Sequence, residues 1–544
     1  MKKDNKSINQ SSYLNTDAEL KEERVSTIAS ANEEENFSPD SLEASEHTLD
    51  DKAHNVPEEP KDESNIDEEK AKLAELRKAK SETYVEFSKA KSALKAAKKK
   101  GEDEKALSEL EEKFNDADMA YRRACSDLVE FQMDVKFRHS RLKQKPELRD
   151  QNIILSVRHL KMFFKLGGWP DYVKLKAVHD ISFDVREKET FGIVGESGCG
   201  KSTTGRCIMH LYDITSGSIY YKGYRIGAGD RWNKKEIKYS KIHAKEKIKS
   251  LEKELEEKTK ALTDPSEIEA LKNEYARQIE EIKKRNAQVV TEQRAKIRQI
   301  HHDNKHAPRK LLNEIQMIFQ DPVDSLDPRM TVEDIIQEGL RIQGHRNVRD
   351  NHKKTVDILE KVGLVPEHAS RYPHEFSGGQ RQRIGIARAL IMNPKILICD
   401  EPISALDVSI RAQIINLLND LKEEMGITMI FIAHDLSTVK YFCDKIAVMY
   451  FGNMVELATS DELFKHPLHP YTKSLLSAIP QPNPLSEKRR ERIMYNPALT
   501  HDYSKQKPTF REILPGHFVL CNDDEFEKYQ QEIAAIDKKQ IKKD

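Results

Sequence analysis

The sequence predicts an α/β domain with a largely parallel β-sheet, joined to two long helical hairpins. Short, β-rich apolar runs alternate with helical stretches from residue 152 onward, an order that is typical of a parallel sheet with helices on its faces. Two other segments, 66–148 and about 230–312, are strongly charged and carry apolar residues at helical spacing on both sides of a turn. Each of these two segments therefore predicts a pair of antiparallel helices.

Charge is unevenly spread along the 544-residue chain. Charged residues make up 34% of it and the net charge is −1, but the first 70 residues hold 20 acidic and 8 basic residues, so they carry −12 and the remainder +11. We expect residues 1–65 to be disordered, because this acidic segment, poor in aromatic residues, buries too little apolar surface to offset its conformational entropy.

The composition also excludes several classes of protein. No apolar run approaches the roughly 18 residues of a membrane-spanning helix, and the N-terminus lacks the apolar core of a signal peptide. The six cysteines are scattered, without a CxxC pair, and predict neither a disulfide framework nor a zinc site. We expect an intracellular protein.

The predicted organisation follows from these shifts in pattern. In the first hairpin the helices are separated at "KKGED" (99–103), and in the second Ser266 and Glu269 fit a capping box at the start of the second helix. The second hairpin interrupts the α/β domain. The predicted parts are a disordered segment (1–65), a helical hairpin (66–148), an α/β domain (152–480) with a coiled-coil insertion at about 230–312, and a tail (481–544).

A phosphate-binding loop follows the apolar strand "FGIV". The run "GESGCGKST" (195–203) fits the pattern G-x-x-x-x-G-K-[ST] between a strand and a helix. The backbone N–H groups of such a loop surround phosphate oxygens. We expect Lys201 to reach the β- and γ-phosphates and the Ser202 hydroxyl to bind Mg²⁺. The predicted nucleotide-binding residues are Gly195, Glu196, Ser197, Gly198, Cys199, Gly200, Lys201, Ser202 and Thr203.

Further polar residues follow two other predicted strands. "KILICDE" (395–401) ends in Asp400, which suits contact with Mg²⁺, and Glu401, which suits general-base work on a water molecule. "TMIFIAH" delivers His434 to the same edge, because parallel strands place their carboxyl ends together where α/β sheets bind ligands.

Four short strings occur in a fixed order around these residues: "MIFQDP" (317–322), "FSGGQ" (376–380), "SALD" (404–407) and "AHD" (433–435). With them, the chain resembles the ATP-binding subunits of ABC transporters over roughly 152–230 and 313–480. The resemblance implies an ABC-type P-loop ATPase domain with a helical subdomain. The usual signature begins with Leu where this chain has Phe376, and both residues are apolar.

The resemblance also implies roles for individual residues. Gln320 would contact Mg²⁺ or the attacking water, His434 would hold the γ-phosphate, and Asp407 would organise the interface of an ATPase dimer. An aromatic residue before the phosphate loop would stack on adenine; Phe164 is favoured over Phe163, and core packing is the alternative for both. The signature residues, which would serve the nucleotide of a partner subunit, are Ser377, Gly378, Gly379 and Gln380.

Longer strings narrow the resemblance. "IFQDPVDSLDPRM" and "HPLHPYTKSLLSAIP" resemble the oligopeptide/dipeptide importer ATPases, and the tail "PTFREILPGHFVLCNDDEF" resembles the OppF group. This implies ATP hydrolysis with Mg²⁺ that drives oligopeptide import, at the cytoplasmic face of the membrane. The implied partners are a second, OppD-like ATPase subunit, two transmembrane permease subunits and an extracellular peptide-binding protein. Importers of dipeptides, nickel or glutathione are alternatives. Some relatives carry an iron–sulfur cysteine cluster in this tail; with Cys521 alone, none is expected.

A coiled-coil ABC ATPase that acts on DNA or ribosomes is a rival from another class. DNA-maintenance proteins of this kind have far longer insertions after the glutamine loop, and ribosome-associated ones carry two cassettes, whereas this chain has one phosphate loop and one signature. We expect no nucleic-acid partner, since aromatic residues are 7% and the N-terminus is acidic. The hairpins are interpreted as solvated decoration, as docking elements for each other or another subunit, or as contacts to anionic lipid.

Overall fold

The computed structural model describes residues 63–100, 104–138, 145, 147–148, 151–167, 173–261, 264–345, 347–404, 406–479 and 492–541. The larger of its two units comprises Asp62–Met162 and Ala177–Asp544, and the other contains Phe163–Lys176. The predicted disorder of residues 1–65 lies outside the described residues except at its end, where helix α3 begins at Glu63.

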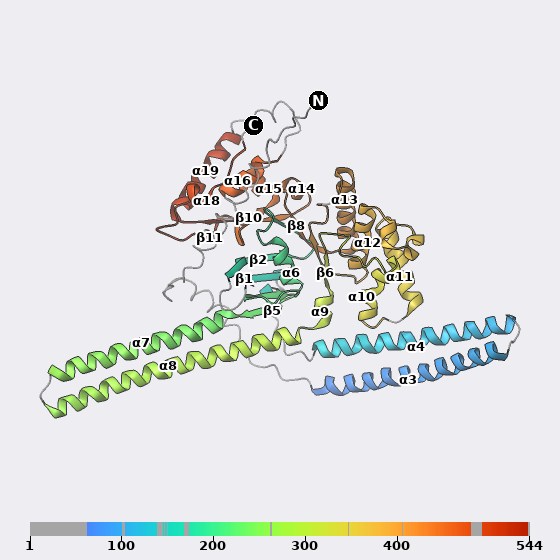
Figure 1. Ribbon diagram of the computed structural model, residues 1–544, viewed down its shortest axis with the longest axis horizontal. Coiled ribbons are helices and arrows are strands. Elements are labelled where there is room, and N and C mark those ends of the chain that lie inside the picture. The colour runs from blue at the N-terminus through green and yellow to red at the C-terminus, as the bar shows by residue number, and fades with distance from the viewer. Residues whose placement is uncertain are drawn as a thin grey trace, which may run out of the picture. The chain divides into compact units, whose positions relative to one another are not determined.

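An eight-stranded sheet lies at the centre of the larger unit (Figure 1), with the strand order β11-β12-β10-β9-β3-β8-β7-β6. The five strands from β9 to β6 run parallel, and the other three pair antiparallel. This confirms the predicted α/β class. The strands are β3 (Thr190–Val194), β6 (Ile315–Ile318), β7 (Ile396–Asp400), β8 (Thr428–Ala433), β9 (Lys445–Tyr450), β10 (Asn453–Thr459), β11 (Thr509–Leu514) and β12 (His517–Cys521).

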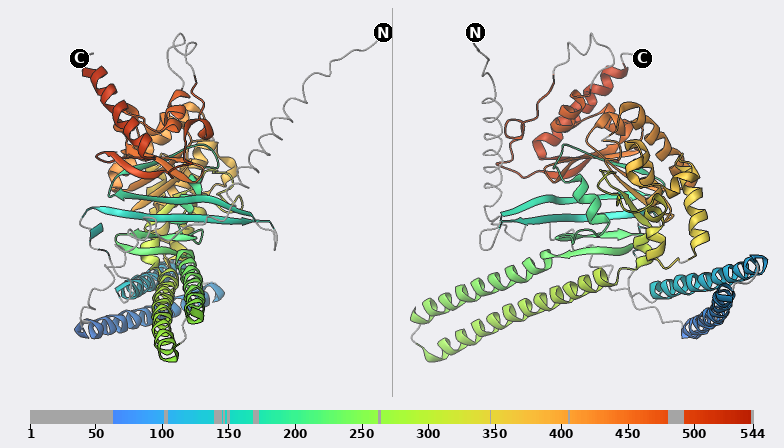
Figure 2. Two further views of the ribbon diagram at one scale, coloured as in Figure 1. Left: turned by 90° about the vertical axis from the view of Figure 1, so that its left-hand side faces the viewer. Right: turned by 45° about the vertical axis from the view of Figure 1, so that its right-hand side comes forward.

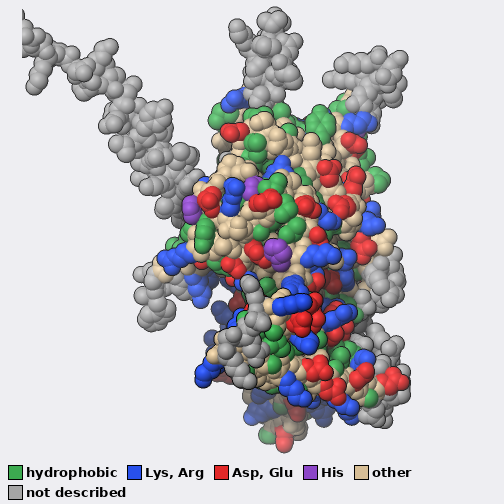
Figure 3. Space-filling model, turned by 90° about the vertical axis from the view of Figure 1, so that its right-hand side faces the viewer, with side chains coloured by type: hydrophobic (Ala, Val, Ile, Leu, Met, Phe, Trp, Pro, Cys, Tyr) green, Lys and Arg blue, Asp and Glu red, His purple; other side chains and the backbone are tan. Residues whose placement is uncertain are grey.

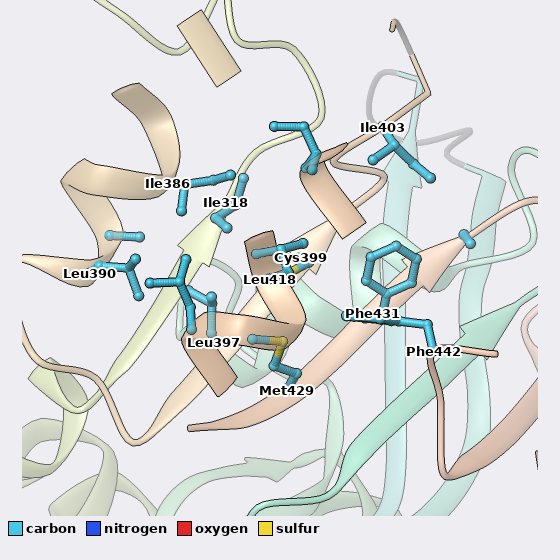
Figure 4. Packing of buried hydrophobic residues seen from close by; sticks show 14 of the residues in the cluster. Ile318, Ile386, Leu390, Leu397, Cys399, Ile403, Leu418, Met429, Phe431 and Phe442 are labelled. Carbon is cyan, nitrogen blue, oxygen red and sulfur yellow. The ribbon is translucent and has the colours of Figure 1, made fainter. Parts of the chain in front are cut away.

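Helices cover this sheet and bury its apolar residues. β3, β7 and β8 are buried along their whole length, as expected for central parallel strands. Figure 4 shows Ile386 and Leu390 of α12 beside Ile318 and Leu397 of the strands, all in one core cluster. This packing holds the strand ends, and the residues that follow them, in fixed positions. The neighbouring helices are α6 (Lys201–Ile208), α12 (Gly378–Leu390), α13 (Val408–Met425) and α14 (Leu436–Val439).

A second sheet has four strands in the order β2-β1-β4-β5. Its β4–β5 hairpin turns tightly, with Tyr221 opposite Tyr224. The Tyr221 hydroxyl donates to Oε2 of Glu314 at 2.5 Å, which connects this sheet to the residue before β6. The strands are β1 (Ile153–Leu166), β2 (Val173–Arg186), β4 (Ser216–Tyr221) and β5 (Tyr224–Asp230).

Further helices lie just before β6, between β6 and α12, and after β10. Helix α10 begins at a Thr331 cap that accepts from the Asp334 N–H, and α11 begins at an Asn347 cap. Within the described ranges, no helix has the length and apolar character needed to span a membrane. These helices are α9 (Arg309–Asn313), α10 (Val332–Ile342), α11 (Val348–Lys361), η1 (Pro366–Ser370), η2 (Pro373–Glu375), α15 (Ser460–Lys465), α16 (Pro470–Ser477), α18 (Pro497–Thr500) and α19 (Asp523–Ile541).

The first hairpin consists of α3 (Glu63–Lys100) and α4 (Glu104–Arg138), two long antiparallel helices (Figure 2). Its apolar stripes pack on each other through aromatic rings: the Phe87 ring centroid lies 5.6 Å from that of Phe114 and 5.5 Å from that of Tyr121. The apolar residues of the two helices therefore pack against each other within the hairpin.

Helix α4 also contacts the α/β domain of its own chain. Ser126 Oγ lies 3.0 Å from Nδ1 of His345, in the turn after α10, and Lys310 of α9 pairs with Asp134. A side-chain atom placed on Gly344 would lie 3.3 Å from Val129. The hairpin thus contacts two places, α9 and the turn after α10, between which the chain forms β6 and α10.

The inserted hairpin consists of α7 (Arg231–Ala261) and α8 (Pro265–His306). Polar pairs cross between the helices, including Ser240 Oγ to Asn286 Oδ1 at 2.8 Å. The predicted capping box is wrong: Asp264 is the N-cap, and its carboxylate accepts from the N–H of Ser266 at 3.0 Å. Because Pro265 suits the first helical position, the cap falls on the residue before it.

Candidate functional site

The phosphate loop runs from the end of β3 to the start of α6, as predicted. Its shape requires glycine at both ends. At Gly200, φ is +104° and a Cβ would lie 2.2 Å from the carbonyl oxygen of Ala177; at Gly195, a Cβ would lie 2.1 Å from that of Met449. Neither contact is possible for a real side chain, so the loop backbone is pressed against the neighbouring strands.

Lys201 lies folded over this loop. Its Nζ donates to the carbonyl oxygens of Gly195 at 2.7 Å and Glu196 at 2.9 Å, and its side chain is buried. The same Nζ lies 3.8 Å from Oε1 of Glu401. The positively charged ammonium group of Lys201 is therefore held between the loop and the end of β7. Ser202 and Thr203 follow it in the first turn of α6.

Asp400 and Ser202 meet beside the loop. The Ser202 hydroxyl donates to Oδ1 of Asp400 at 2.7 Å. The carboxylate is fully buried, and its Oδ2 has no hydrogen-bond partner among the described residues. Burial raises the pKa of Asp400, against the hydrogen bond from Ser202 and the positive charge of Arg206, which lower it. A buried, partly unsatisfied carboxylate beside a hydroxyl oxygen suits a hard divalent cation.

Glu401 is the point at which the other predicted residues meet. Its Oε2 accepts from Nε2 of Gln320 at 3.1 Å and lies 3.3 Å from Nδ1 of His434. The three residues follow β6, β7 and β8, which are adjacent and parallel. Glu401 has φ of +46°, a left-handed backbone that is rare outside glycine, and its N–H donates to the carbonyl oxygen of Ile432 at 3.1 Å. The backbone is thus turned so that the side chain joins this group.

The signature residues form a helix N-terminus of their own. Ser377 caps α12: its Oγ accepts from the N–H of Gln380 at 3.3 Å, and Oε1 of Gln380 accepts from the N–H of Ser377 at 3.1 Å. Ser377 and Gly378 are exposed, and a Cβ on Gly379 would lie 2.8 Å from Ile410. Among the residues that the structure describes, no hydrogen bond or ion pair links this segment to the phosphate loop.

Two other predicted residues stand apart from the Glu401 group. Asp407 is exposed and is the N-cap of α13, where its side chain makes no capping hydrogen bond. Phe163 and Phe164 are half-buried residues of β1 and belong to the smaller unit. The stacking of Phe164 on adenine stays a prediction.

Tyr471, in the first turn of α16, was missed by the sequence analysis. Its hydroxyl accepts a hydrogen bond from the N–H of Glu196 at 2.9 Å. The string "HPLHPYT" contributed to the family resemblance, but it predicted no role for Tyr471. A side chain that binds a backbone amide 275 positions away leaves no local pattern by which it could have been found.

Comparison with known protein families gives two matches. The family described as "ABC transporter" matches residues 178–307 and 287–404, two parts that overlap in the region of α8. The family described as "Oligopeptide/dipeptide transporter, C-terminal region" matches residues 455–511, which begin before the predicted tail.

Individual proteins are similar over most of their length. The oligopeptide transport ATP-binding protein OppF of Bacillus subtilis (strain 168) is 45% identical over 377 residues, covering 69% of this chain and 98% of that protein. OppF of Streptococcus pyogenes serotype M1 is 42% identical, with 70% and 99% covered. The dipeptide transport ATP-binding protein DppF of Lactococcus lactis subsp. cremoris (strain MG1363) is 41% identical, with 65% and 91% covered.

Proposed function

The chain belongs to the family of ATP-binding subunits of ABC-type oligopeptide and dipeptide transporters, and on this premise we propose that it hydrolyses ATP to drive the import of oligopeptides. The observation that carries the proposal is the meeting of Lys201, Gln320 and His434 around Glu401. A phosphate loop alone serves many nucleotide-binding proteins. A carboxylate held by a glutamine and a histidine beside that loop suits hydrolysis in particular.

We propose that Glu401 is the general base. Its carboxylate accepts from Gln320 and lies beside His434, so its oxygens are held in place before a water molecule arrives. The water would lose a proton to Glu401 while Lys201 compensates negative charge on the phosphoryl group. Catalysis by such a site is mainly positioning and charge stabilisation, and His434 would hold the γ-phosphate.

Ser202 and Asp400, with Gln320, are the residues that would hold Mg²⁺. The unsatisfied Oδ2 of buried Asp400 and the adjacent Ser202 oxygen fit this ion. When bound with ATP, Mg²⁺ neutralises charge on the β- and γ-phosphates. The chain's own contribution is to keep these oxygens fixed at the end of β7 and the start of α6.

The signature supports a dimer of ATPase subunits. The exposed Ser377 hydroxyl and the N-terminus of α12 form a site suited to an anion, while Lys201 serves the phosphate loop. We propose that Ser377, Gly378, Gly379 and Gln380 contact the nucleotide of a partner subunit and that exposed Asp407 lies at the interface. An OppD-like chain is the proposed partner, and a second copy of this chain is the alternative.

The remaining partners follow from the importer assignment. We propose two permease subunits, contacted through the segment from Gln320 to Arg329, where Val323 is 55% exposed, and an extracellular peptide-binding protein reached through them. The subunit would sit peripherally on the cytoplasmic face of the membrane. The face in Figure 3 carries basic and acidic side chains interspersed, unlike the concentrated basic surface that nucleic-acid binding requires.

The proposal is tested by purification of the full-length chain from native membranes and by uptake measurements. We expect two permease subunits, a second ATPase and a binding protein to co-purify, and ATP-dependent oligopeptide uptake to be lost in cells that carry Glu401→Gln. Dipeptide transport is the second candidate, favoured by the similarity to DppF; uptake of labelled dipeptides, nickel and glutathione in the same cells separates these cases. Unchanged uptake of every solute, or recovery with ribosomes or DNA, would overturn the importer assignment.

A further inference from the structure

Besides the Ala177 carbonyl that lies against Gly200, the phosphate loop is supported from outside at three points by residues that follow β8 in the chain. The Met449 carbonyl lies against Gly195, and the N–H of Gly452 donates to the carbonyl oxygen of Cys199 at 2.9 Å. The third support is the hydroxyl of Tyr471, which accepts from the N–H of Glu196 at 2.9 Å. Of these three contacts, only the last uses a side chain, so it is the one that a substitution can remove cleanly.

Tyr471 is itself rigidly placed. It is 1% exposed, and its backbone N–H donates to Nδ1 of His469, the cap of α16, at 3.1 Å. Its ring centroid lies 4.5 Å from that of Tyr450 and 5.6 Å from that of Tyr495. Because the side chain is already held in place, little conformational entropy is lost when its hydroxyl binds the loop, and the hydrogen bond can form before nucleotide binds.

The hydroxyl is neutral at physiological pH, as that of an ordinary tyrosine is, and burial raises the pKa of Tyr471 further. It therefore acts as a hydrogen-bond acceptor for the loop and not as a charge. The amide it occupies belongs to the second residue of the phosphate loop. With that N–H engaged by Tyr471, the peptide between Gly195 and Glu196 is fixed in one orientation, and so is its own carbonyl oxygen, that of Gly195, which accepts from Lys201.

We propose that Tyr471 is a positioning residue for ATP binding, which acts by fixing the Gly195–Glu196 peptide of the phosphate loop. It lies in the region 455–511 that the chain shares with oligopeptide and dipeptide transporters, so this region contributes directly to the nucleotide site. The inference rests on the ATP binding that is part of the proposed function, and it concerns how the loop is held in shape before ATP arrives.

The test uses Tyr471→Phe in the full-length chain, which deletes one oxygen and keeps the ring. Hydrogen exchange in the nucleotide-free protein should become faster in the peptide that contains residues 195–200. The Kd for a fluorescent ATP analogue should rise about two- to tenfold, as expected for one lost hydrogen bond, while kcat at saturating ATP in the assembled transporter changes much less. Tyr503→Phe is the matched control, because it removes a hydroxyl that contacts His501 at 2.9 Å in the same region.

A second variant removes the same hydrogen bond from the loop side and guards against misfolding of the first. Glu196→Pro lacks the N–H, and it should weaken ATP binding by a similar factor; the double variant should weaken it no further, since both changes break one interaction. The inference is overturned if Tyr471→Phe leaves exchange and Kd unchanged, if Tyr503→Phe shifts them equally, or if the two effects multiply. The exchange measurement needs no hydrolysis, so failure of the proposed ATPase function and failure of this inference are distinguishable.

Discussion

The hydroxyl of Ser202 donates a 2.7 Å hydrogen bond to Oδ1 of Asp400. This contact joins the first turn of α6 to the end of β7, and it holds together two oxygen-bearing side chains whose chemistry suits a divalent cation. It leaves the other oxygen, Oδ2, buried and without a hydrogen-bond partner in the described part of the chain. Without a cation, the protein therefore carries an unfavourable buried charge at this point.

The first prediction concerns stability and pH at Asp400. Its pKa is raised by burial, so the folded state favours the protonated carboxyl, and this contribution is lost as pH rises through the raised pKa. At neutral pH in EDTA we expect Asp400→Asn to increase the free energy of unfolding by on the order of 1 kcal/mol. The gain should shrink as pH falls and the wild-type carboxyl becomes protonated. Thermal unfolding at several pH values checks this; a gain that grows toward acid pH would contradict it.

The second prediction separates binding from turnover at Glu401. Glu401→Gln keeps the contact with Gln320 possible but removes the base, so ATP hydrolysis should fall about 10²- to 10⁴-fold while ATP still binds. Phosphate release and binding of a fluorescent ATP analogue give the two measurements. Glu424→Gln is the control, since Glu424 is an exposed acid paired with Lys361 on the surface. Appreciable hydrolysis by the Glu401 variant would exclude the general-base role.

The third prediction tests whether the signature acts on a partner's nucleotide. Ser377→Arg places a large side chain at an exposed helix cap, so hydrolysis by the assembled transporter should drop about 10²-fold, as when an anion-binding donor is lost. ATP binding to the isolated chain should be unchanged. Ser370→Arg, an exposed serine in the same helical region, should have little effect on either. If the Ser377 variant loses ATP binding as an isolated chain, the signature serves its own loop and the prediction is wrong.

The fourth prediction compares two glycines of the phosphate loop. Both have positive φ, +82° at Gly198 and +104° at Gly200, but a Cβ meets no atom within 4 Å at Gly198 and lies 2.2 Å from a carbonyl oxygen at Gly200. Gly198→Ala should cost about 1 kcal/mol from backbone strain alone, and Gly200→Ala about 3 kcal/mol or more, since the loop must also move. Chemical denaturation measures both. If both variants lost the same amount of stability, the loop would be able to move away from the Ala177 carbonyl without a measurable cost in free energy, and the prediction would be wrong.

Much of the Glu401 group could be predicted from the sequence. Gln320, Glu401 and His434 are far apart in the chain, yet each follows an apolar strand, and parallel strands bring such residues to one edge. Other features depend on single contacts. The cap of α8 fell on Asp264 because of the proline after it.

Long-range contacts escaped prediction for a different reason. The contact of Tyr471 with Glu196 joins two parts of the chain through one hydrogen bond and produces no periodicity.

The local β11–β12 hairpin was also missed, although "LPGH" contains the Pro-Gly pair that marks turns, and Gly516 there has φ of +77°. Its strands are too short to give a clear alternation of apolar and polar residues.

The last prediction concerns the inserted hairpin. Helices α7 and α8 contact each other along the hairpin, Tyr275 is buried there, and Ser240 lies against Asn286. Replacing residues 241–285 with a short glycine linker removes facing parts of both helices together, so we expect it to expose little apolar surface. We expect ATP binding and thermal stability to be retained. By contrast, Asp303→Ala in the intact chain should cost about 3 kcal/mol, because it leaves the largely buried Arg225 unpaired at the base of the hairpin.

The same shortened chain decides whether the hairpin docks on another subunit. Loss of transporter assembly or of peptide uptake, with ATP binding intact, would show that the removed helices contact a partner. Retention of both would assign them to solvated decoration and leave the base around Asp303 as the part that the fold requires. Asp303→Asn, which keeps the size of the side chain but not its charge, should lie between the wild type and the alanine variant in stability. If the shortened chain lost as much stability as the Asp303→Ala variant, the outer part of the hairpin would also be needed for folding, and the prediction would be wrong.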